Sequence, residues 1–458
     1  MLDLNALIAT RMMMGIGVLL AGIFMYLFSR KFWGEVGGLV SGLFYMYASY
    51  HAVEIYVRGA VGEFWAYAFL PLMALGFYKK NVLIGAAGFA GVVLSHNLTA
   101  LMLVPFLIII ALLYCYIAYQ RKNPLIIYHS SLIILLGLGI SAFYWLPALL
   151  ELGYTNVQSQ VGGGADFRDH FVCWQQLWQS QWGFGGSTTG CLDGLSMKIG
   201  KLSIVVSFVA FVLALWRWKK DQMRARSIVV AIGLLLFSIF LMLEISKPIW
   251  EGISAMAFIQ YPWRFLVFAS FFSSFLAGAL IWFANRSSKV SLGLALALLG
   301  VLFYTNVRLF EPKTIGAKAV EDYTSDYHTK WVTSAISDEY MPKDFAKPKS
   351  EVEIVERRVS VREVKVNKTQ ELVFETNEPE EKQVLVAIAP FPAWQVSIDG
   401  NIVSYKNTDR GIAFTVPAGK HTIQIAFVST PTEKVVNGIS LVSILILLGG
   451  ILRNLWRK

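Results

Sequence analysis

The sequence predicts an α-helical polytopic membrane protein with about 11 transmembrane helices and an extracytoplasmic β-sandwich domain. Of its 458 residues, 56% are hydrophobic and only 15% are charged. A soluble protein normally carries about a quarter charged residues, so this apolar excess indicates membrane spans. Two further observations support the prediction: basic residues recur in pairs beside apolar runs, and one long stretch alternates in polarity as strands do.

The apolar runs are numerous enough for a large helical bundle. A span needs about 20 mostly apolar residues, and we count about eleven such runs. The first run is too long for a cleavable signal peptide and lacks a small-residue cleavage site, so it is interpreted as a span. The shortest run fits a tilted or half-inserted helix. The runs cover residues 11–29, 33–50, 62–78, 81–95, 98–119, 125–150, 201–218, 227–244, 263–284, 289–307 and 434–452.

Basic residues follow every odd-numbered run, which orients the bundle. The positive-inside rule makes these ends cytoplasmic, so the N-terminus and the β domain are expected outside a bacterial cytoplasmic (inner) membrane and the C-terminus inside. The net charge of +10 therefore reflects topology, and no basic stripe interleaved with aromatic residues indicates nucleic acid. The clusters are Arg30, Lys31, Lys79, Lys80, Arg121, Lys122, Arg217, Lys219, Lys220, Arg224, Arg226, Arg286, Lys289, Arg453, Arg457 and Lys458.

The β domain is predicted at residues 311–433, between a helical bundle at 1–310 and a last helix at 434–458. Asp399 and Gly400 separate two alternating runs, which is a strong hairpin signal. Pro417–Gly419 resembles a second turn. The expected strands lie at 352–356, 361–366, 371–375, 396–398, 401–403 and 422–427.

One polar motif spans residues 51–63, in a loop predicted to lie outside. Glu54 and Arg58 are four residues apart, so on a helix they would share a face and could pair. Arg58 and Glu63 lie at the membrane boundary, where an ionised group is costly unless it is paired or bound to a ligand. Two interpretations remain open: interfacial anchoring, or binding of an anionic head group, for which the planar arginine fork is suited.

Two shorter motifs occur in other outer loops. His96 and Asn97 form a tight turn, which is a sufficient structural explanation, but a histidine beside an outer cavity could also serve as acid, base or phosphate donor. Trp263 and Arg264 follow Pro262 at the mouth of the ninth run, either as ordinary interfacial residues or as groups that stack on a sugar and hold a phosphate.

The outer loop at 151–200 begins at Glu151, after the sixth run. Aromatic residues recur there every three or four positions, which predicts an amphipathic interfacial helix that ends near Gly183 and either guides a lipid-linked substrate or plugs the bundle. Cys173 and Cys191 share the loop, and a disulfide between them is one of two open alternatives. Asp166, Asp169 and His170 lack a specific ligand spacing, so no metal site is expected. The aromatic residues are Phe167, Phe171, Trp174, Trp178 and Trp182.

Signatures of soluble enzymes do not occur in the sequence. We find no nucleotide-binding glycine loop, no zinc-binding cysteine cluster and no nucleophile elbow. No cofactor is therefore expected, and a reaction at the outer face would need an activated substrate that arrives through the lipid.

A set of short motifs carries a family resemblance over nearly the whole chain. They are Tyr56–Glu63, Ser95–Leu98, Tyr144–Pro147, Trp182–Gly185, Asp193–Met197, Gln260–Arg264, Asp338–Pro342, Ala393–Gly400 and Pro417–His421. With these motifs the chain resembles the YfhO-like bacterial membrane proteins, often labelled pyruvoyl-tetrahydropterin-synthase-related. The pterin label does not fit, because such synthases resemble soluble enzymes with a three-histidine zinc site and the six histidines here are scattered.

The YfhO-like family in turn resembles GT-C glycosyltransferases. That resemblance implies transfer of a sugar from a polyprenyl-phosphate donor to a cell-envelope glycan or protein acceptor, with membrane lipids as further partners. The expected catalytic residues are Glu63 and His96, which would orient or deprotonate the acceptor. The expected substrate-binding residues are Arg58 and Arg264 for the lipid phosphate, Glu54 to position Arg58, Trp263 as a stacking face, and Asn97 and Glu151.

One departure from the GT-C pattern favours an alternative. Those enzymes start inside and carry a catalytic acidic residue in their first outer loop, whereas this chain is predicted to start outside with Asp3 as its only acidic residue before the first run. The expectation is therefore either an N-terminally truncated enzyme or a non-catalytic envelope assembly or lipid-binding protein that uses the β domain as a partner module.

Overall fold

The computed structural model describes residues 5–162, 165–284, 288–316, 319–333, 339–350, 352–355 and 359–456. The chain divides into two compact units, each considered by itself below. One comprises Met1–Ser141, Val161–Asp326 and Leu441–Lys458, and the other comprises Ala142–Gln160 and Tyr327–Ser440. Predictions made for Asp3, Arg286, Asp338, Glu356, Arg457 and Lys458 lie outside the described residues.

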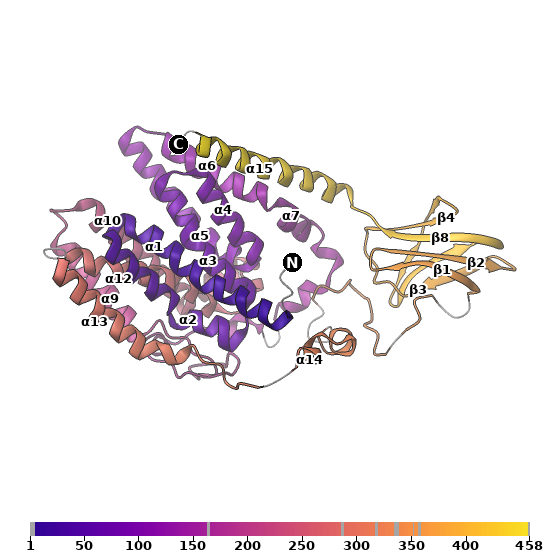
Figure 1. Cartoon of the computed structure of the whole chain (residues 1–458), viewed down its shortest axis with the longest axis horizontal. Coiled ribbons are helices and arrows are strands. Elements are labelled where there is room, and N and C mark those ends of the chain that lie inside the picture. Colours follow the sequence, from indigo (N-terminus) through magenta and orange to yellow (C-terminus); the bar gives the residue numbers. More distant parts are fainter. Residues whose placement is uncertain are drawn as a thin grey trace. The chain divides into compact units, whose positions relative to one another are not determined.

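The first unit is a helical bundle (Figure 1). Its long first helix, α1 (Ala6–Met46), changes direction at Gly34, where φ is +75° and ψ is −177°. The two halves then pack closely, because a Cβ atom on Gly42 would lie only 2.8 Å from the carbonyl oxygen of Gly22. The first two apolar runs of the sequence therefore form a helical hairpin whose contact depends on small residues.

The longer remaining helices of the bundle follow the predicted apolar runs, whereas α8, α11 and α14 are short helices outside them. The most deeply buried is α12 (Leu266–Phe283), which packs against α1, α9 and α10. Aromatic rings fill the contact between α1 and α12, with Phe28 stacked 5.8 Å from Phe271. The other helices are α2 (Ser49–Ala52), α3 (Val61–Lys79), α4 (Val82–Ser95), α5 (Asn97–Arg121), α6 (Leu125–Ile140), α8 (Trp174–Trp178), α9 (Lys201–Trp216), α10 (Gln222–Met242), α11 (Lys247–Gly252), α13 (Ser288–Asn306) and α14 (Glu321–Thr324).

The last helix, α15 (Pro431–Trp456), returns to the bundle. The part of α15 around Ile444 and Leu447 packs on α4 and α6, where these two side chains cover a buried cluster of Ala86, Ala90 and Ile140. Figure 1 shows α15 alongside α6. Since residues 125–140 and 441–456 are far apart in the sequence, this contact closes the bundle.

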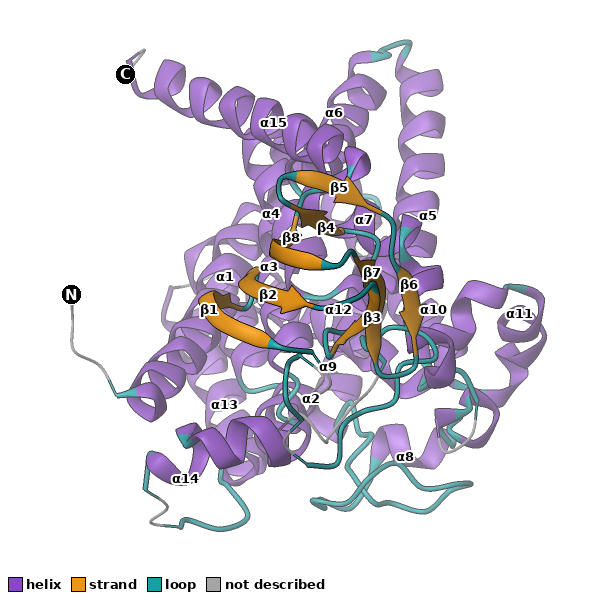
Figure 2. Cartoon of the chain, turned by 90° about the vertical axis from the view of Figure 1, so that its right-hand side faces the viewer, coloured by secondary structure: helices purple, strands orange, loops and turns teal. Residues whose placement is uncertain are grey.

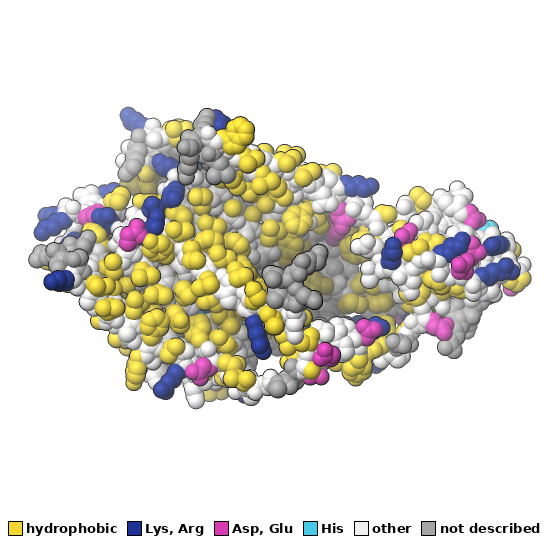
Figure 3. Space-filling view, in the orientation of Figure 1, with side chains coloured by type: hydrophobic (Ala, Val, Ile, Leu, Met, Phe, Trp, Pro, Cys, Tyr) yellow, Lys and Arg dark blue, Asp and Glu magenta, His cyan; other side chains and the backbone are white. Residues whose placement is uncertain are grey.

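Seven helices in the described part of the chain are long and apolar enough to cross a membrane. They become eight if α6 and α7 (Ala142–Leu150) together form one span, and two shorter apolar helices occur in addition. Hydrophobic side chains cover much of the visible helical surface in Figure 3. Every predicted run overlaps at least one helix, although the count of eleven spans and their orientation remain predictions.

The second unit contains two antiparallel sheets (Figure 2). The five-stranded sheet has the order β1-β2-β8-β4-β5, and the three-stranded sheet has the order β3-β7-β6. The strands are β1 (Val361–Lys368), β2 (Glu371–Glu378), β3 (Lys382–Val386), β4 (Trp394–Ile398), β5 (Asn401–Val403), β6 (Lys406–Thr408), β7 (Gly411–Val416) and β8 (Gly419–Phe427).

Both sheets contribute to one hydrophobic core. Phe374 of β2, Val386 of β3 and Phe414 of β7 are almost completely buried in this cluster. Alternate residues of β2 are buried, as its sequence pattern predicts. The hairpin prediction is confirmed: Asp399 and Gly400 join β4 to β5 with φ values of +49° and +84°, the left-handed conformation of a type I′ turn.

The predicted strand at 352–356 is wrong over the described residues 352–355. Val355 forms one isolated bridge to Val386, and its side chain joins the core. A short extended segment with one inward side chain produces the same alternation as a strand, so the pattern could not distinguish the two.

The predicted amphipathic helix over 167–182 is also wrong. A 3₁₀ turn covers Phe167–Asp169, and α8 spans only five residues. The carboxylate of Asp193 accepts hydrogen bonds from the Ser180 hydroxyl at 2.6 Å and the Gln181 amide nitrogen at 3.0 Å, which holds that backbone extended. The aromatic side chains do not share a face, since Phe167 is buried whereas Trp174 is exposed. Cys173 and Cys191 form a disulfide that closes this segment.

Candidate functional site

A buried charge cluster forms where α2, α3 and α12 begin or end. After α2 the chain makes a π-helical turn over Val53–Arg58 and then adopts a left-handed conformation at Gly59, with φ of +59°. π-Helical turns inside helices are rare and frequent at functional sites. This reversal returns the start of α3 toward Arg58, so Glu63 and Arg58 face each other.

Arg58, Glu63 and Tyr50 form a closed hydrogen-bonded triangle. An Arg58 Nη1 group donates to Glu63 Oε2 at 2.7 Å and to the Tyr50 hydroxyl at 2.9 Å. The Tyr50 hydroxyl donates to the other carboxylate oxygen of Glu63 at 2.5 Å. The Glu63 side chain is completely buried and that of Arg58 is 14% exposed. A buried charge is tolerated only when its partners replace water, and this triangle supplies them.

Arg264 brings a second buried cation to the same carboxylate. It lies in a 3₁₀ turn (Pro262–Phe265) that leads into α12. Its Nε atom is 3.9 Å from Glu63 Oε2, too far for a hydrogen bond. Within the described part of the chain, its Nε and Nη1 groups have no hydrogen-bond partner, although the residue is only 9% exposed. Arg264 is therefore an incompletely paired buried cation.

Aromatic rings border the cluster. The Arg58 guanidinium lies 4.7 Å from the ring centre of Trp263, a cation–π distance. Trp263 stacks on Tyr261 and donates from Nε1 to the Ser187 hydroxyl at 2.9 Å. Ser187 in turn lies 2.9 Å from His170 Nδ1. This chain of contacts attaches the disulfide-closed segment to the cluster.

His96 lies next to the cluster at the start of α5. Its Nδ1 atom accepts a hydrogen bond from the Thr99 amide at 3.2 Å and lies 2.8 Å from the Thr99 hydroxyl, so it caps the helix. A Cβ atom on Gly62 would lie 3.4 Å from His96 Cδ2, which places the ring beside the residue that precedes Glu63. The imidazole interacts electrostatically with Glu63, Arg264 and Arg58. Its Nε2 atom makes no hydrogen bond to the described residues.

The predicted pairing of Glu54 with Arg58 is wrong. Neither carboxylate oxygen of Glu54 has a hydrogen-bond partner among the described residues, although the residue is fully buried. The prediction assumed α-helical spacing, whereas residues 53–58 form a π-helical turn. The guanidinium of Arg58 instead forms its ion pair with Glu63. Glu54 therefore does not position Arg58 by direct contact.

Two other predicted binding residues have different surroundings. Asn97 is the first residue of α5, and its side chain is exposed. Glu151 belongs to the second unit, where it accepts a hydrogen bond from the Thr430 hydroxyl at 3.3 Å. Thr430 and Glu433 form a reciprocal capping box at the start of α15. Glu151 thus contacts a helix cap in the second unit.

Four of the residues that meet in the cluster were predicted as site residues from the sequence, namely Arg58, Glu63, Trp263 and Arg264. It missed Tyr50 and Ser187. Tyr50 directly precedes the polar motif that begins at His51, and this proximity was the only available signal. Nothing in the local pattern around Ser187 could have indicated its contact with Trp263, 76 residues away.

The fold and this cluster define the class of protein: a multi-pass membrane protein with a buried, hydrogen-bonded charge cluster and a separate β-sheet region. In the described residues, no three His, Cys, Asp or Glu side chains gather as a metal site would require. Comparison with protein-family models, curated proteins and solved structures finds no match.

Proposed function

We propose that the protein is a GT-C-like membrane glycosyltransferase that takes a sugar from a polyprenyl-phosphate donor at the outer face of a bacterial inner membrane. The observation that carries the proposal is Arg264, a buried cation whose Nε and Nη1 atoms have no hydrogen-bond partner among the described residues. Burying such a cation is costly unless an anion completes its hydrogen bonds. A phosphate supplies the charge and the acceptor oxygens that a guanidinium fork binds best.

Topology supports the choice of a lipid-linked donor. The loops that carry Tyr50, Glu63, His96 and Arg264 all fall on the side that the distribution of basic residues assigns to the outside. With eleven spans, the N-terminus and a β-sandwich formed by the two sheets would share that side, and the C-terminus would be cytoplasmic. Nucleotide-activated sugars are cytoplasmic, whereas a polyprenyl carrier reaches this face through the lipid.

We propose separate roles for these residues in the transfer. An acceptor hydroxyl oxygen attacks C1 of the donor sugar, the bond between C1 and the phosphate oxygen breaks, and the polyprenyl phosphate leaves with that electron pair. Arg264 and Arg58 stabilise the negative charge on the leaving phosphate. His96 Nε2 accepts the hydroxyl proton. Glu63 holds Arg58, because both of its oxygens already accept hydrogen bonds.

Binding to a lipid phosphate tests the proposal without requiring the acceptor. Purified protein is titrated with polyprenyl phosphate and with the neutral polyprenol, and complexes are counted by native mass spectrometry. We expect Arg264→Gln to weaken phosphate binding at least about tenfold, because a charge-assisted hydrogen bond contributes about 1.5–3 kcal/mol. Polyprenol binding should not change.

The matched control is Arg308→Gln, which removes an exposed arginine of the same charge at the end of α13. It should bind both lipids as the unaltered protein does. If Arg264→Gln binds polyprenyl phosphate as tightly as this control, the assignment of the phosphate to Arg264 is wrong.

The occupied carboxylate of Glu63 favours a second candidate, a non-catalytic lipid-binding or envelope assembly protein. A glycosyltransferase should lose sugar transfer in His96→Ala while it keeps its affinity for polyprenyl phosphate. A lipid-binding protein should show Arg264-dependent binding but no transfer of radiolabelled sugar from any polyprenyl-linked donor. The two measurements together separate the candidates.

A further inference from the structure

A cavity of the bundle lies at the start of α9, with none of the charge-cluster residues in its lining. It is bordered by the segment Trp178–Ser180, by residues 198–203 and by the end of α13. Its volume is about 170 Å³. Engineered cavities of about 150 Å³ hold one benzene molecule, so this cavity admits one six-membered ring.

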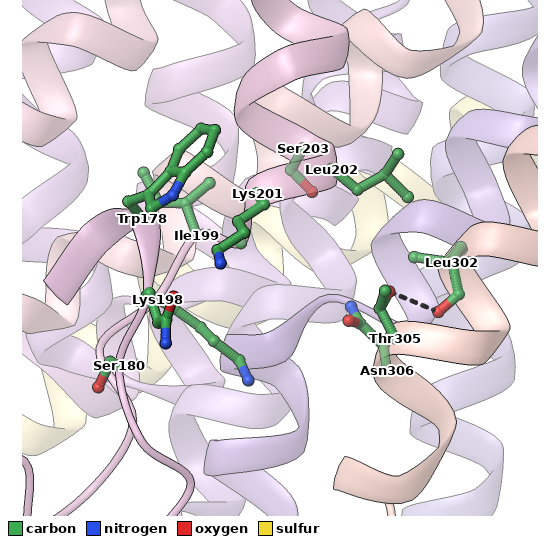
Figure 4. Close-up of a pocket in the computed structure, with 12 residues that line it drawn as sticks. Trp178, Ser180, Lys198, Ile199, Lys201, Leu202, Ser203, Leu302, Thr305 and Asn306 are labelled. Carbon is green, nitrogen blue, oxygen red and sulfur yellow. Dashed lines mark hydrogen bonds between the residues drawn. The ribbon is translucent and has the colours of Figure 1, made fainter. Parts of the chain in front are cut away.

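Two lysine side chains enter the cavity without a carboxylate partner. Figure 4 shows Lys198 and Lys201 extending into the space that faces Thr305 and Asn306. In the described part of the chain neither amine forms an ion pair, and none of the lining residues is acidic. The carboxylate of Asp193 contacts the lining residue Ser180, but its oxygens are occupied by Ser180, Gln176 and the Gln181 amide.

The environment of the two lysines favours a negatively charged occupant. Lys198 is half-buried, and burial lowers the pKa of its amine because it penalises the charged form. A neighbouring anion would offset that penalty. The adjoining helix α9 begins at Lys201 without a side-chain cap, and its first N–H groups carry the positive end of the helix dipole. An anion here would meet two ammonium groups and free backbone donors together.

The other lining groups suit a sugar ring. Trp178 is 40% exposed and offers an indole face at the edge of the cavity. Asn306 donates to the Tyr47 carbonyl at 2.8 Å, which fixes its amide and leaves its side-chain oxygen as an acceptor. Ser203 and Gln179 add polar groups. An aromatic face combined with a few fixed polar groups is typical of a small-molecule site.

We propose that this cavity binds a single sugar ring that carries a negative group, either a carboxylate or a phosphate. The proposal does not depend on the function proposed above, because the cavity shares no lining residue with the Arg58–Glu63–Arg264 cluster. Such a ring can be the terminal residue of an acidic glycan or a free acidic sugar.

The test is a set of titrations of the purified full-length protein by isothermal calorimetry. The probes are glucuronate, glucose 6-phosphate, neutral glucose and inorganic phosphate. We expect at least one of the two acidic sugars to bind at least about tenfold more tightly than glucose and inorganic phosphate, because only it uses both the lysines and the indole. Preference between glucuronate and glucose 6-phosphate identifies the anionic group.

Three variants and one control complete the test. Lys198→Gln and Lys201→Gln should each weaken binding of the acidic sugar at least about tenfold. Trp178→Ala should weaken binding of the sugars and leave binding of inorganic phosphate unchanged. Lys313→Gln, an exposed lysine outside the lining, should bind as the unaltered protein does. Lys201 is exposed, so its replacement leaves the fold intact.

Three results would overturn the proposal. If neither acidic sugar binds more tightly than neutral glucose, the site does not recognise the negative group. If neither binds more tightly than inorganic phosphate, the site does not recognise the sugar ring. Unchanged binding in both lysine variants would place the ligand elsewhere. Arg264→Gln should not affect these titrations, so a failure here is distinguishable from a failure of the lipid-phosphate assignment.

Discussion

Two carboxylates in this protein hold cations at similar distances but in opposite surroundings. In the helical unit, Glu63 is completely buried and lies 2.7 Å from Arg58. In the β-sheet unit, Glu375 lies 2.5 Å from Lys365 and 3.1 Å from Lys420, whose side chains are 43% and 60% exposed. Both lysines lower the pKa of Glu375 by hydrogen bonding, with Lys365 contributing more.

The comparison teaches that burial, and not distance, determines what an ion pair contributes. Water already solvates the charges of an exposed pair, so the pair adds little to stability. In the buried cluster each charge depends on the protein alone for its hydrogen bonds, and removing one partner leaves the other without compensation. Four substitutions test this difference, from the largest expected effect to the smallest.

Arg58→Gln should have the largest effect. It removes the cation that is hydrogen-bonded to the buried Glu63 carboxylate and leaves only Arg264, at 3.9 Å. Breaking a buried pair in this way costs about 3–5 kcal/mol. The measurement is the midpoint of thermal unfolding in detergent, followed by intrinsic tryptophan fluorescence. An unchanged midpoint would mean that the cluster is solvated in the native protein. Arg308→Gln serves as the exposed control.

Glu54→Gln should have a much smaller effect than Glu63→Gln, although both carboxylates are buried. Glu54 makes no hydrogen bond to the described residues that the substitution could break. We expect the free energy of unfolding to change by less than about 1 kcal/mol. The same thermal unfolding measurement compares both variants. A loss for Glu54→Gln as large as that for Glu63→Gln would contradict the assignment of the carboxylate's partners.

The pair of His421 and Asp399 in the β-sheet unit should give a small, pH-dependent contribution. Their side chains are 2.6 Å apart, and hydrogen bonding to Asp399 raises the pKa of His421. A raised pKa in the folded state stabilises the protein below the unfolded pKa of about 6.5, and this contribution is lost as pH rises through the higher folded value.

We therefore expect the hairpin that carries Asp399 to become less stable as pH rises from about 6 to about 8. The change should be below about 1 kcal/mol, because water screens this exposed pair. Hydrogen exchange of the Thr422 amide, which donates to Asp399 at 2.8 Å, reports the local stability. His421→Gln should abolish the pH dependence, and a dependence that persists would assign it to another group.

Lys365→Gln should have the smallest effect of the four. Glu375 keeps Lys420 as a partner and remains accessible to water, so no measurable change in the unfolding midpoint is expected. Added salt should likewise leave the midpoint unchanged. A large drop in the unfolding midpoint of this variant would show that the exposed network stabilises the protein as much as the buried cluster does, and would contradict the comparison.

Local chemistry explains which parts of the fold were predictable. The Asp399–Gly400 hairpin followed from two residues that tolerate positive φ, and the helices followed from the length of each apolar run. The segment 167–182 was mispredicted because its shape depends on the Cys173–Cys191 disulfide and on hydrogen bonds to Asp193, all made by residues distant in sequence. Periodicity does not report such contacts.

The candidate site shows the same division. The motifs around Arg58 and Arg264 were visible as charged residues at the ends of apolar runs, where charge is costly. Their common contact with Glu63 required α3 and α12 to meet, more than 200 residues apart in the chain. The predicted ion pair between Glu54 and Arg58 was wrong, because the backbone between them is π-helical.

The sequence by itself determined the class of secondary structure, the apolar helices, the β hairpin and the location of the costly charges, because these depend on composition and on spacing along the chain. Tertiary structure decided which charge pairs with which, which carboxylate stays unpartnered, and where Lys198 and Lys201 enter a cavity. The physical reason is that burial and hydrogen bonding are set by residues that only the folded chain brings together.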